Sequence, residues 1–202
     1  MILIQDYIRE FSLAFPNAGN MLPWHFTSQL RELISSMIEL LNNDFTVENN
    51  VAVHRSAIIE AGVILKAPAI IHADCFIGGH AYLRGGVFLG NGVSIGPGVE
   101  IKSSYIGSNS SIAHYNFIGD SLLGSEVNFE AGAVIANHYN ERKEKDISVR
   151  INGNNFHTGT TKFGALVGDH SKIGANAVLS PGTVLPPASV VKRLALVEQG
   201  ST

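Results

Sequence analysis

The stretch VFLGNGVSIGPGVEIKSS, residues 87–104, decides the fold because it divides into three units of six residues. Each unit begins with valine, carries leucine or isoleucine in its third position and ends in glycine or serine. Apolar side chains at alternate positions, followed by a turn-forming residue, are typical of a short strand with two inward side chains. The same pattern extends back to residue 51, and its third positions are Val53, Ile59, Leu65, Ile71, Ile77, Leu83, Leu89, Ile95 and Ile101.

A strand in every hexad leaves no room for helices or hairpin loops between strands. The chain must instead coil, with three short sides per turn, so that residues three hexads apart stack at roughly the 4.8 Å spacing of neighbouring strands. Parallel strands of successive coils then satisfy one another's backbone groups. The hexads therefore predict an all-β solenoid, a parallel β-helix.

The repeat continues with slips to Ile135 and resumes from Val167 to Val191. The interval 138–162 is highly charged, and its Asn152-Gly153 pair predicts a hairpin turn between short extended arms. A loop of this length in so regular a solenoid favours a functional role. The repeat is lost after Lys192, so we expect residues 192–202 to form a frayed tail.

Residues 1–50 precede the repeat and are expected to form a short helical segment. Leu30, Ile34 and Ile38 follow helical spacing, with Thr27 or Ser28 as possible N-caps. Such a helix would cover the end of the β-coil or pack against a partner subunit. The expected organisation is a helical segment at 1–50, a β-helix domain at 51–191 and the tail.

Composition excludes several classes of protein. The net charge of −3 argues against a nucleic-acid-binding protein, which normally carries a basic excess. The single cysteine, Cys75, rules out an internal disulfide and fits a reducing compartment. There is no apolar run long enough for a membrane span and no basic leader, so a cytoplasmic protein without membrane contact is expected.

Stacking of successive coils brings certain polar side chains together. Lys66, Arg84 and Lys102 are spaced three hexads apart and should form a column of cations, which is either a solvated ladder or a docking site for a phosphate or similar anion. His54 and His72 should stack too, but zinc requires three or four ligands, so we interpret them as exposed turn residues rather than as a metal site.

His114 differs from the other histidines because it lies in SIAHYNFIGD (111–120), which interrupts the small turn residues of the repeat. Asn116 occupies a slot that neighbouring hexads keep for small residues. Histidine is the commonest general base near neutral pH. His114 is therefore the candidate for proton transfer, although a lone histidine is more often structural.

The segment VEIKSSYIGSNSSIAHYNFIGDSLLGSEVNFEAGAVIAN (99–137) resembles the acetyltransferase domain of the bifunctional N-acetylglucosamine-1-phosphate uridyltransferase/glucosamine-1-phosphate acetyltransferase family. It is also similar to archaeal-type sugar-phosphate nucleotidyltransferases with such a domain. This resemblance covers about residues 50–191. It implies a left-handed β-helix, a homotrimer with sites between subunits, acetyl-CoA as the acetyl donor and a sugar phosphate as the acceptor.

The resemblance also implies roles for individual residues. The catalytic base falls on His114, the acidic residue beside it on Glu100, and the residue near acyl transfer on Asn137. The remaining implied contacts are Arg84 and Lys102 for the sugar phosphate, Asn128 for the sugar, and Ala131 for the cofactor.

Two departures from the family pattern affect these roles. A family tyrosine that contacts the acceptor is replaced by Phe117, which removes one hydroxyl contact. The charged 138–162 segment replaces a short loop, and of its lysines, Lys143, Lys145 and Lys162, we take Lys162 as the candidate for the cofactor.

Three functions remain open at this point. The first is an acetyltransferase acting on an amino-sugar phosphate, without nucleotidyl transfer, since residues 1–50 lack a glycine-rich nucleotide-binding loop. The second is an inactive β-helix that serves binding or assembly. A third, a metal hydratase of the γ-carbonic-anhydrase kind, requires a histidine pair with four residues between its members, which this chain lacks.

Overall fold

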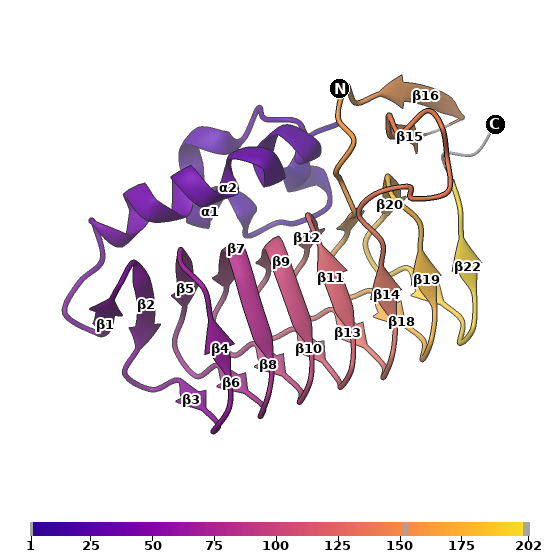
Figure 1. Cartoon of the computed structure of the whole chain (residues 1–202). Helices are drawn as coiled ribbons and strands as arrows, with labels where there is room; N and C mark the ends of the chain where they lie inside the picture. The colour runs from indigo at the N-terminus through magenta and orange to yellow at the C-terminus, as the bar shows by residue number, and fades with distance from the viewer. Residues whose placement is uncertain (1, 152, 200–202) are drawn as a thin grey trace.

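The computed structural model describes residues 2–151 and 153–199 and confirms the predicted left-handed parallel β-helix with an N-terminal helical segment (Figure 1). The coils have three faces. The covered face contains β2 (Val51–His54), β5 (Ala69–Ile71), the second halves of β7 (Tyr82–Leu89) and β9 (Glu100–Ile106), β12 (Leu122–Leu123), β17 (Ala165–Val167) and β20 (Thr183–Leu185).

The open face contains β3 (Ile58–Ile59), β6 (Phe76–Ile77), β8 (Ser94–Ile95), β10 (Ser111–Ile112), β13 (Asn128–Phe129), β18 (Lys172–Ile173) and β21 (Val190–Val191). The third face contains β4 (Ile64–Leu65), the first halves of β7 and β9, β11 (Phe117–Gly119), β14 (Val134–Ile135), β19 (Val178–Leu179) and β22 (Leu196–Val197). The inward aliphatic side chains predicted from the hexads form one core along the coil axis.

Stacking at an interval of three full hexads holds for the first coils and again for the last, where Lys172 pairs with Val190 and Val178 with Leu196. Ile58 pairs with Phe76, and Phe76 pairs with Ser94, as the hexads predict. Ser94 then pairs with Ser111 rather than with Ile112, so this coil is one residue shorter. The next coil is shortened in the same way, because Ser111 pairs with Asn128. The shorter coils change which side chains meet in this part of the solenoid, and they include the candidate site.

The N-terminal segment lies along the covered face rather than over the end of the coil, which corrects one of our two alternatives (Figure 1). It contains 3-10 turns at Ile4–Asp6 and Pro16–Ala18, helix α1 (Phe11–Ala14) and helix α2 (Pro23–Ile38). The reason is a column of outward-facing apolar side chains on this face, which needs a cover: Ala52, Ile70, Phe88, Tyr105, Leu122, Leu166 and Val184.

Helix α2 begins earlier than predicted. Its first residue is Pro23, which suits the first turn of a helix because it needs no N–H partner there. Thr27 and Ser28, the expected N-caps, instead donate their hydroxyls to the carbonyls of Trp24 and His25 inside the helix. Leu30, Ile34 and Ile38 are buried as the spacing predicted.

A bulge in β7 makes room for α2. Arg84 pairs with Lys102, whereas Val87 pairs with Ser104, so β7 holds one residue more than β9 between these two pairs. Gly86 has φ +96°, and a Cβ there would lie 3.0 Å from the Cα of Arg31 in α2. The backbone of the helix and that of the bulge therefore touch without an intervening side chain.

The charged insertion forms the expected hairpin, with β15 (Ser148–Ile151) antiparallel to β16 (Asn154–His157). Asn152, the first residue of the predicted turn, lies outside the described residues. The segment is anchored: the Tyr139 hydroxyl donates to the Pro181 carbonyl at 3.0 Å, and the Arg142 guanidinium lies 3.5 Å from the Tyr139 ring centre.

Both ends of the solenoid differ from the predicted bounds. Strand β1 (Phe45–Glu48) precedes it and pairs antiparallel with β2. At the other end, Leu196 and Val197 of β22 pair with Val178 and Leu179, so the expected frayed tail contains a further strand. The hexad spacing in fact continues, because Val197 follows Val191 by six residues and packs against the same core.

A buried carboxylate ties the N-terminal segment to the coil. The side chain of Asp169 accepts hydrogen bonds from the backbone N–H groups of Arg9 and Ser125, at 3.0 and 2.8 Å. Within the described residues, no helix is long and apolar enough to cross a membrane.

Candidate functional site

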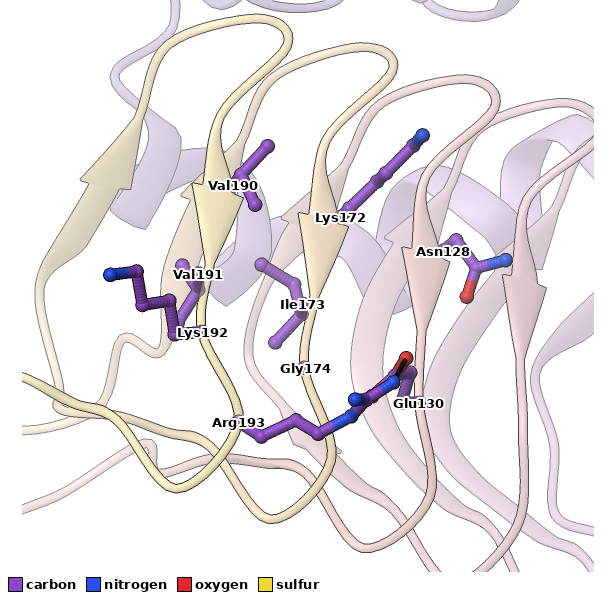
Figure 2. A pocket seen from close by; sticks show the side chains of 9 residues that line it. All are labelled: Asn128, Glu130, Lys172, Ile173, Gly174, Val190, Val191, Lys192 and Arg193. Carbon is purple, nitrogen blue, oxygen red and sulfur yellow. Dashed lines mark hydrogen bonds and ion pairs between the residues drawn. The ribbon is translucent and has the colours of Figure 1, made fainter.

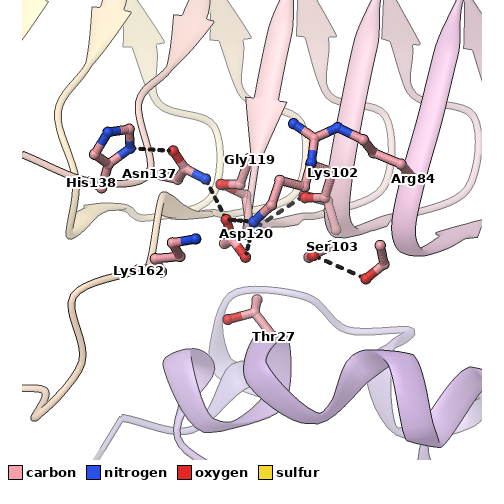
Figure 3. Close-up of polar contacts among 12 residues, drawn as sticks. Thr27, Arg84, Lys102, Ser103, Gly119, Asp120, Asn137, His138 and Lys162 are labelled. Atoms are coloured by element: carbon pink, nitrogen blue, oxygen red, sulfur yellow. Dashed lines mark hydrogen bonds and ion pairs between the residues drawn. The ribbon is translucent and has the colours of Figure 1, made fainter. Parts of the chain in front are cut away.

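The predicted column of cations exists. Leu65 pairs with Leu83, and Arg84 pairs with Lys102, so Lys66, Arg84 and Lys102 follow one another along the edge of the third face. The next position in the column is Gly119. This edge adjoins the covered face and the first turns of α2, and we call it the cation corner (Figure 3).

Two of the cations are neutralised within the chain. Arg84 Nε donates to Glu100 Oε1 at 2.8 Å, and Lys102 Nζ lies 2.6 Å from Asp120 Oδ2. Glu100 is therefore the partner of Arg84, whereas we had expected it beside His114. The pairing follows from the register, which places Glu100 over Tyr82, two positions before Arg84 on the same face.

Asp120 is the centre of the cation corner, and sequence analysis missed it. It is 7% exposed, and besides Lys102 its carboxylate accepts a hydrogen bond from Asn137 Nδ2. The other amide atom, Asn137 Oδ1, lies 3.1 Å from Nδ1 of His138 (Figure 3). A signal was available, since Asp120 follows Lys102 by the same three-hexad interval that separates Lys102 from Arg84.

The geometry of this corner requires a glycine. A Cβ on Gly119 would lie 2.8 Å from Asn137 Nδ2. Because Gly119 has no side chain, the Asn137 amide crosses over it and reaches Asp120. The predicted Lys162 is exposed on the neighbouring segment, and Figure 3 shows it beside Asn137. Two backbone hydrogen bonds hold the segment that carries Lys162. The N–H of Phe163 donates to the Asn137 carbonyl, and the N–H of Gly164 donates to the Asp120 carbonyl.

His114 lies at a different corner, between the open face and the third face. It is exposed, and the bend is made by Tyr115, which has φ +57°. The ring contacts Tyr115 edge to face at 5.7 Å, and within the described ranges its imidazole nitrogens form no hydrogen bond. The shortened register places His114 between Pro97 and Ala131, so Ala131, the residue expected near the cofactor, is a neighbour of His114.

His114 and the cation corner lie at opposite edges of one face. Five positions separate His114 from Gly119, the residue paired with Lys102, which corresponds to roughly 15 Å of extended chain. Phe117 lies between them on β11 and is half-buried over Glu100. Within one chain the predicted base and the predicted phosphate ligands are therefore not brought together.

Asn128 falls in a third place, on the open face. It lines a groove of about 620 Å³ together with Glu130, Lys172, Lys192 and Arg193 (Figure 2). Arg193 Nη2 lies 2.6 Å from Glu130 Oε1, and this guanidinium lowers the pKa of Glu130 to about 2. Lys172 and Lys192 supply further positive charge along the groove. The part of the chain that the structure describes contains no cluster of metal-ligating side chains.

Comparison with known proteins identifies the family. The model for the GMPPB C-terminal domain matches residues 42–157, more than half of the chain. The chain belongs to the GMPPB C-terminal domain family. That match spans β1, the first coils and the hairpin, and it includes the cation corner as far as His138 and all of the His114 corner.

Relatives of this member of the GMPPB C-terminal domain family include two bifunctional archaeal proteins. The bifunctional sugar-1-phosphate nucleotidylyltransferase/acetyltransferase of Sulfurisphaera tokodaii is 36% identical over 100 residues, covering 46% of this chain and 24% of the relative. The bifunctional protein GlmU of Methanococcus vannielii is 33% identical over 100 residues, covering 50% of this chain and 23% of the relative. The aligned region is thus about a quarter of each relative.

Among solved structures, a hexapeptide transferase family protein from Anaplasma phagocytophilum covers 71% of this chain and 70% of its own, with a TM-score of 0.40 and 17% identity. The predicted resemblance to an acetyltransferase-type β-helix domain is confirmed by the family match and by the named relatives.

Proposed function

We propose that this domain transfers an acetyl group from acetyl-CoA to an amino or hydroxyl group of a sugar phosphate. The observation that carries the proposal is the cation corner, where Arg84 and Lys102 follow one another in successive coils and Lys162 lies on the adjoining segment, in a member of the GMPPB C-terminal domain family. The Sulfurisphaera relative, whose name combines sugar-1-phosphate nucleotidylyltransferase with acetyltransferase, supports the same reaction class.

In this mechanism His114 acts as the general base. Its imidazole takes a proton from the acceptor's amino or hydroxyl group, and the freed lone pair attacks the thioester carbonyl carbon. A C–N or C–O bond forms, the C–S bond breaks, and the thiolate takes the proton back from the imidazolium. General acid–base assistance of this kind contributes about 10²–10⁴ in rate.

The phosphate of the acceptor would bind at a cation corner, which positions the acceptor for attack. Since the corner and His114 lie roughly 15 Å apart in one chain, we infer that a site combines the corner of one subunit with the histidine of another. A homotrimer would provide this. The third face leaves apolar side chains accessible on its first and last strands, with Ile64 50% and Leu196 64% exposed, which supports contact with another subunit.

Acetyl-CoA would lie as substrate along the open face. The groove there is lined by Lys172 and Lys192, and Asn128 stands at its edge (Figure 2). Lysine ammonium groups suit the phosphates of coenzyme A, and Ala131, next to His114, is small enough to leave space for the thioester arm. The donor set therefore fits the substrate.

The test is a thiol-release assay with acetyl-CoA against a panel of amino-sugar and hydroxyl-sugar phosphates. Turnover with at least one acceptor, lost in His114→Ala while the thermal unfolding curve is unchanged, would support the proposal. His170→Ala, which removes another exposed turn histidine, serves as the control and should retain activity. Wild-type turnover in His114→Ala would remove the assignment of the base.

A second candidate, an inactive β-helix that serves assembly, is favoured by two observations. Arg84 and Lys102 already have carboxylate partners, and Phe117 offers no hydroxyl to an acceptor. Titration calorimetry separates the two functions: an enzyme should bind acetyl-CoA, whereas an inactive scaffold should release no heat with acetyl-CoA at any concentration tested.

A further inference from the structure

The histidine that lies at the cation corner is His138, not His114. It follows Asn137 directly and is the last member of a chain of hydrogen bonds that begins at Lys102 (Figure 3). His138 is exposed, whereas Asp120 and Asn137 are buried, at 7% and 6% exposure. A buried polar network thus holds an imidazole that faces solvent. In many active sites a histidine base is oriented in this way by a neighbouring polar group.

The chemistry of the network sets the direction of each hydrogen bond. A carboxylate beside a lysine ammonium only accepts, so the Asn137 amide must turn its NH₂ toward Asp120. Asn137 Oδ1 is then the atom that faces His138, and an oxygen only accepts. Nδ1 of His138, 3.1 Å away, must therefore carry the proton. In the neutral ring this leaves Nε2 with an unshared lone pair.

Lys162 adds a charge close to Asp120 and Asn137. It is exposed, and across residues 2–151 and 153–199 it forms no ion pair, unlike Arg84 and Lys102. Figure 3 shows Lys162 on the same side of Asn137 as Asp120, whereas His138 lies on the other side. Around Asn137 the described residues thus present a cation without an ion pair, Lys162, and a neutral acceptor with a fixed direction, the His138 ring.

We propose that His138 is a specificity-determining residue whose Nε2 accepts a hydrogen bond from a hydroxyl or amino group of the sugar, while Lys162, the expected cofactor contact, instead binds the phosphate of that sugar. This inference rests on the proposed function and names a contact within that site. A lone pair on Nε2 favours a neutral hydrogen-bond donor and disfavours an anion. The Asp120–Asn137 pair acts through the ring by fixing its tautomer.

The first experiment measures the tautomer and needs no activity. Long-range ¹H–¹⁵N NMR spectra of the ¹⁵N-histidine-labelled full chain at pH 8 should show His138 protonated at Nδ1. In Asn137→Ala the ring should revert to a mixture of tautomers. A His138 ring protonated at Nε2 in the wild type would overturn the proposal. His157, an exposed histidine on the hairpin, is the internal reference.

The second experiment adds ligands to the uniformly ¹⁵N-labelled full chain, in which backbone as well as histidine resonances are observed. Glucosamine 1-phosphate should shift the Nε2 resonance of His138, and inorganic phosphate should not. Equal shifts with both ligands would show an anion site and refute the sugar contact. If glucosamine 1-phosphate shifts resonances around Lys162 and Lys102 but leaves His138 unmoved, the proposed function survives and this inference fails. If no resonance moves with glucosamine 1-phosphate or with other sugar phosphates, both the proposed function and this inference fail.

Kinetics provide the third readout once an acceptor is known. His138→Phe should raise the acceptor KM by about tenfold, because one hydrogen bond to the acceptor is lost. The KM for acetyl-CoA should stay unchanged. His157→Phe, matched in exposure and in substitution, should leave both values unchanged. An unchanged acceptor KM in His138→Phe would contradict the proposal.

Discussion

Lys102 and Asp120 occupy successive coils of the solenoid, and the ammonium of Lys102 lies 2.9 and 2.6 Å from the two carboxylate oxygens of Asp120. Their side chains are only 17% and 10% exposed, so each charge depends on the other. This pair also holds the Asn137 amide, and through it His138. It links the backbone register of two coils to the polar surface of the cation corner.

Removing one member of this pair should be costly. Asp120→Ala leaves the Lys102 ammonium unpaired in a largely buried position, and we expect a loss of about 2–4 kcal/mol in the free energy of unfolding. Urea unfolding monitored by circular dichroism measures it. Lys102→Met in the Asp120→Ala background should recover part of the loss. Additive losses in the double variant would contradict the coupling.

The partner of Glu100 distinguishes two roles for that carboxylate. In the structure it neutralises Arg84, so Glu100→Gln should increase the positive charge offered to a phosphate and lower the acceptor KM. If Glu100 instead supported the His114 imidazole, Glu100→Gln would lower kcat. We expect kcat of Glu100→Gln to stay within about twofold of the wild-type value. Steady-state kinetics of this variant distinguish the two roles. Arg84→Ala, the complementary change, should mainly raise the acceptor KM.

His72, which the sequence predicted to be an exposed turn residue, is half-buried against Phe45 and Phe88, and it should make the stability of the protein depend on pH. Burial lowers the pKa of His72, with a smaller contribution from nearby His54, and its Nε2 is buried without a hydrogen-bond partner among the described residues. The ring is neutral in the folded state and takes up a proton on unfolding below pH about 6.5. The unfolded state then binds more protons, so stability falls as the pH falls through that value.

The variant His72→Phe checks this assignment. Its ring would pack between Phe45 and Phe88, whose centres lie 5.3 and 4.9 Å from that of His72. Melting temperatures measured from pH 8 to pH 5 should decline less in His72→Phe than in the wild type. Parallel declines would show that other groups are responsible.

The bulge at Gly86 should tolerate no side chain. Gly86→Ala adds a Cβ 3.0 Å from the Cα and N of Arg31 in a backbone with φ +96°, so we expect a loss of about 1–3 kcal/mol. Gly153→Ala is the matched control, because Gly153 has φ +79° but no atom of the described residues within 4 Å of the added Cβ. Thermal unfolding of both variants separates the contact from the conformational cost. Equal losses would show that α2 does not press on the bulge.

The sequence by itself determined the repeating architecture. Inward aliphatic residues such as Ile71, Leu89 and Ile101 recur at hexad spacing, and only a coiled strand buries all of them on one axis. It also determined the cation column, because Lys66, Arg84 and Lys102 lie in coils that keep the full three-hexad length. These features depend on local periodicity, which a linear pattern records in full.

Tertiary structure decided which groups neutralise those charges and where the helix lies. From Val87 onward two successive coils are one residue shorter, so Gly119 rather than Asp120 covers Lys102, and the carboxylate turns in from the bend. The N-terminal helix covers a side of the coil because Phe88 and Tyr105 project outward from it. Such outcomes depend on register and on packing between distant segments, which periodicity does not encode.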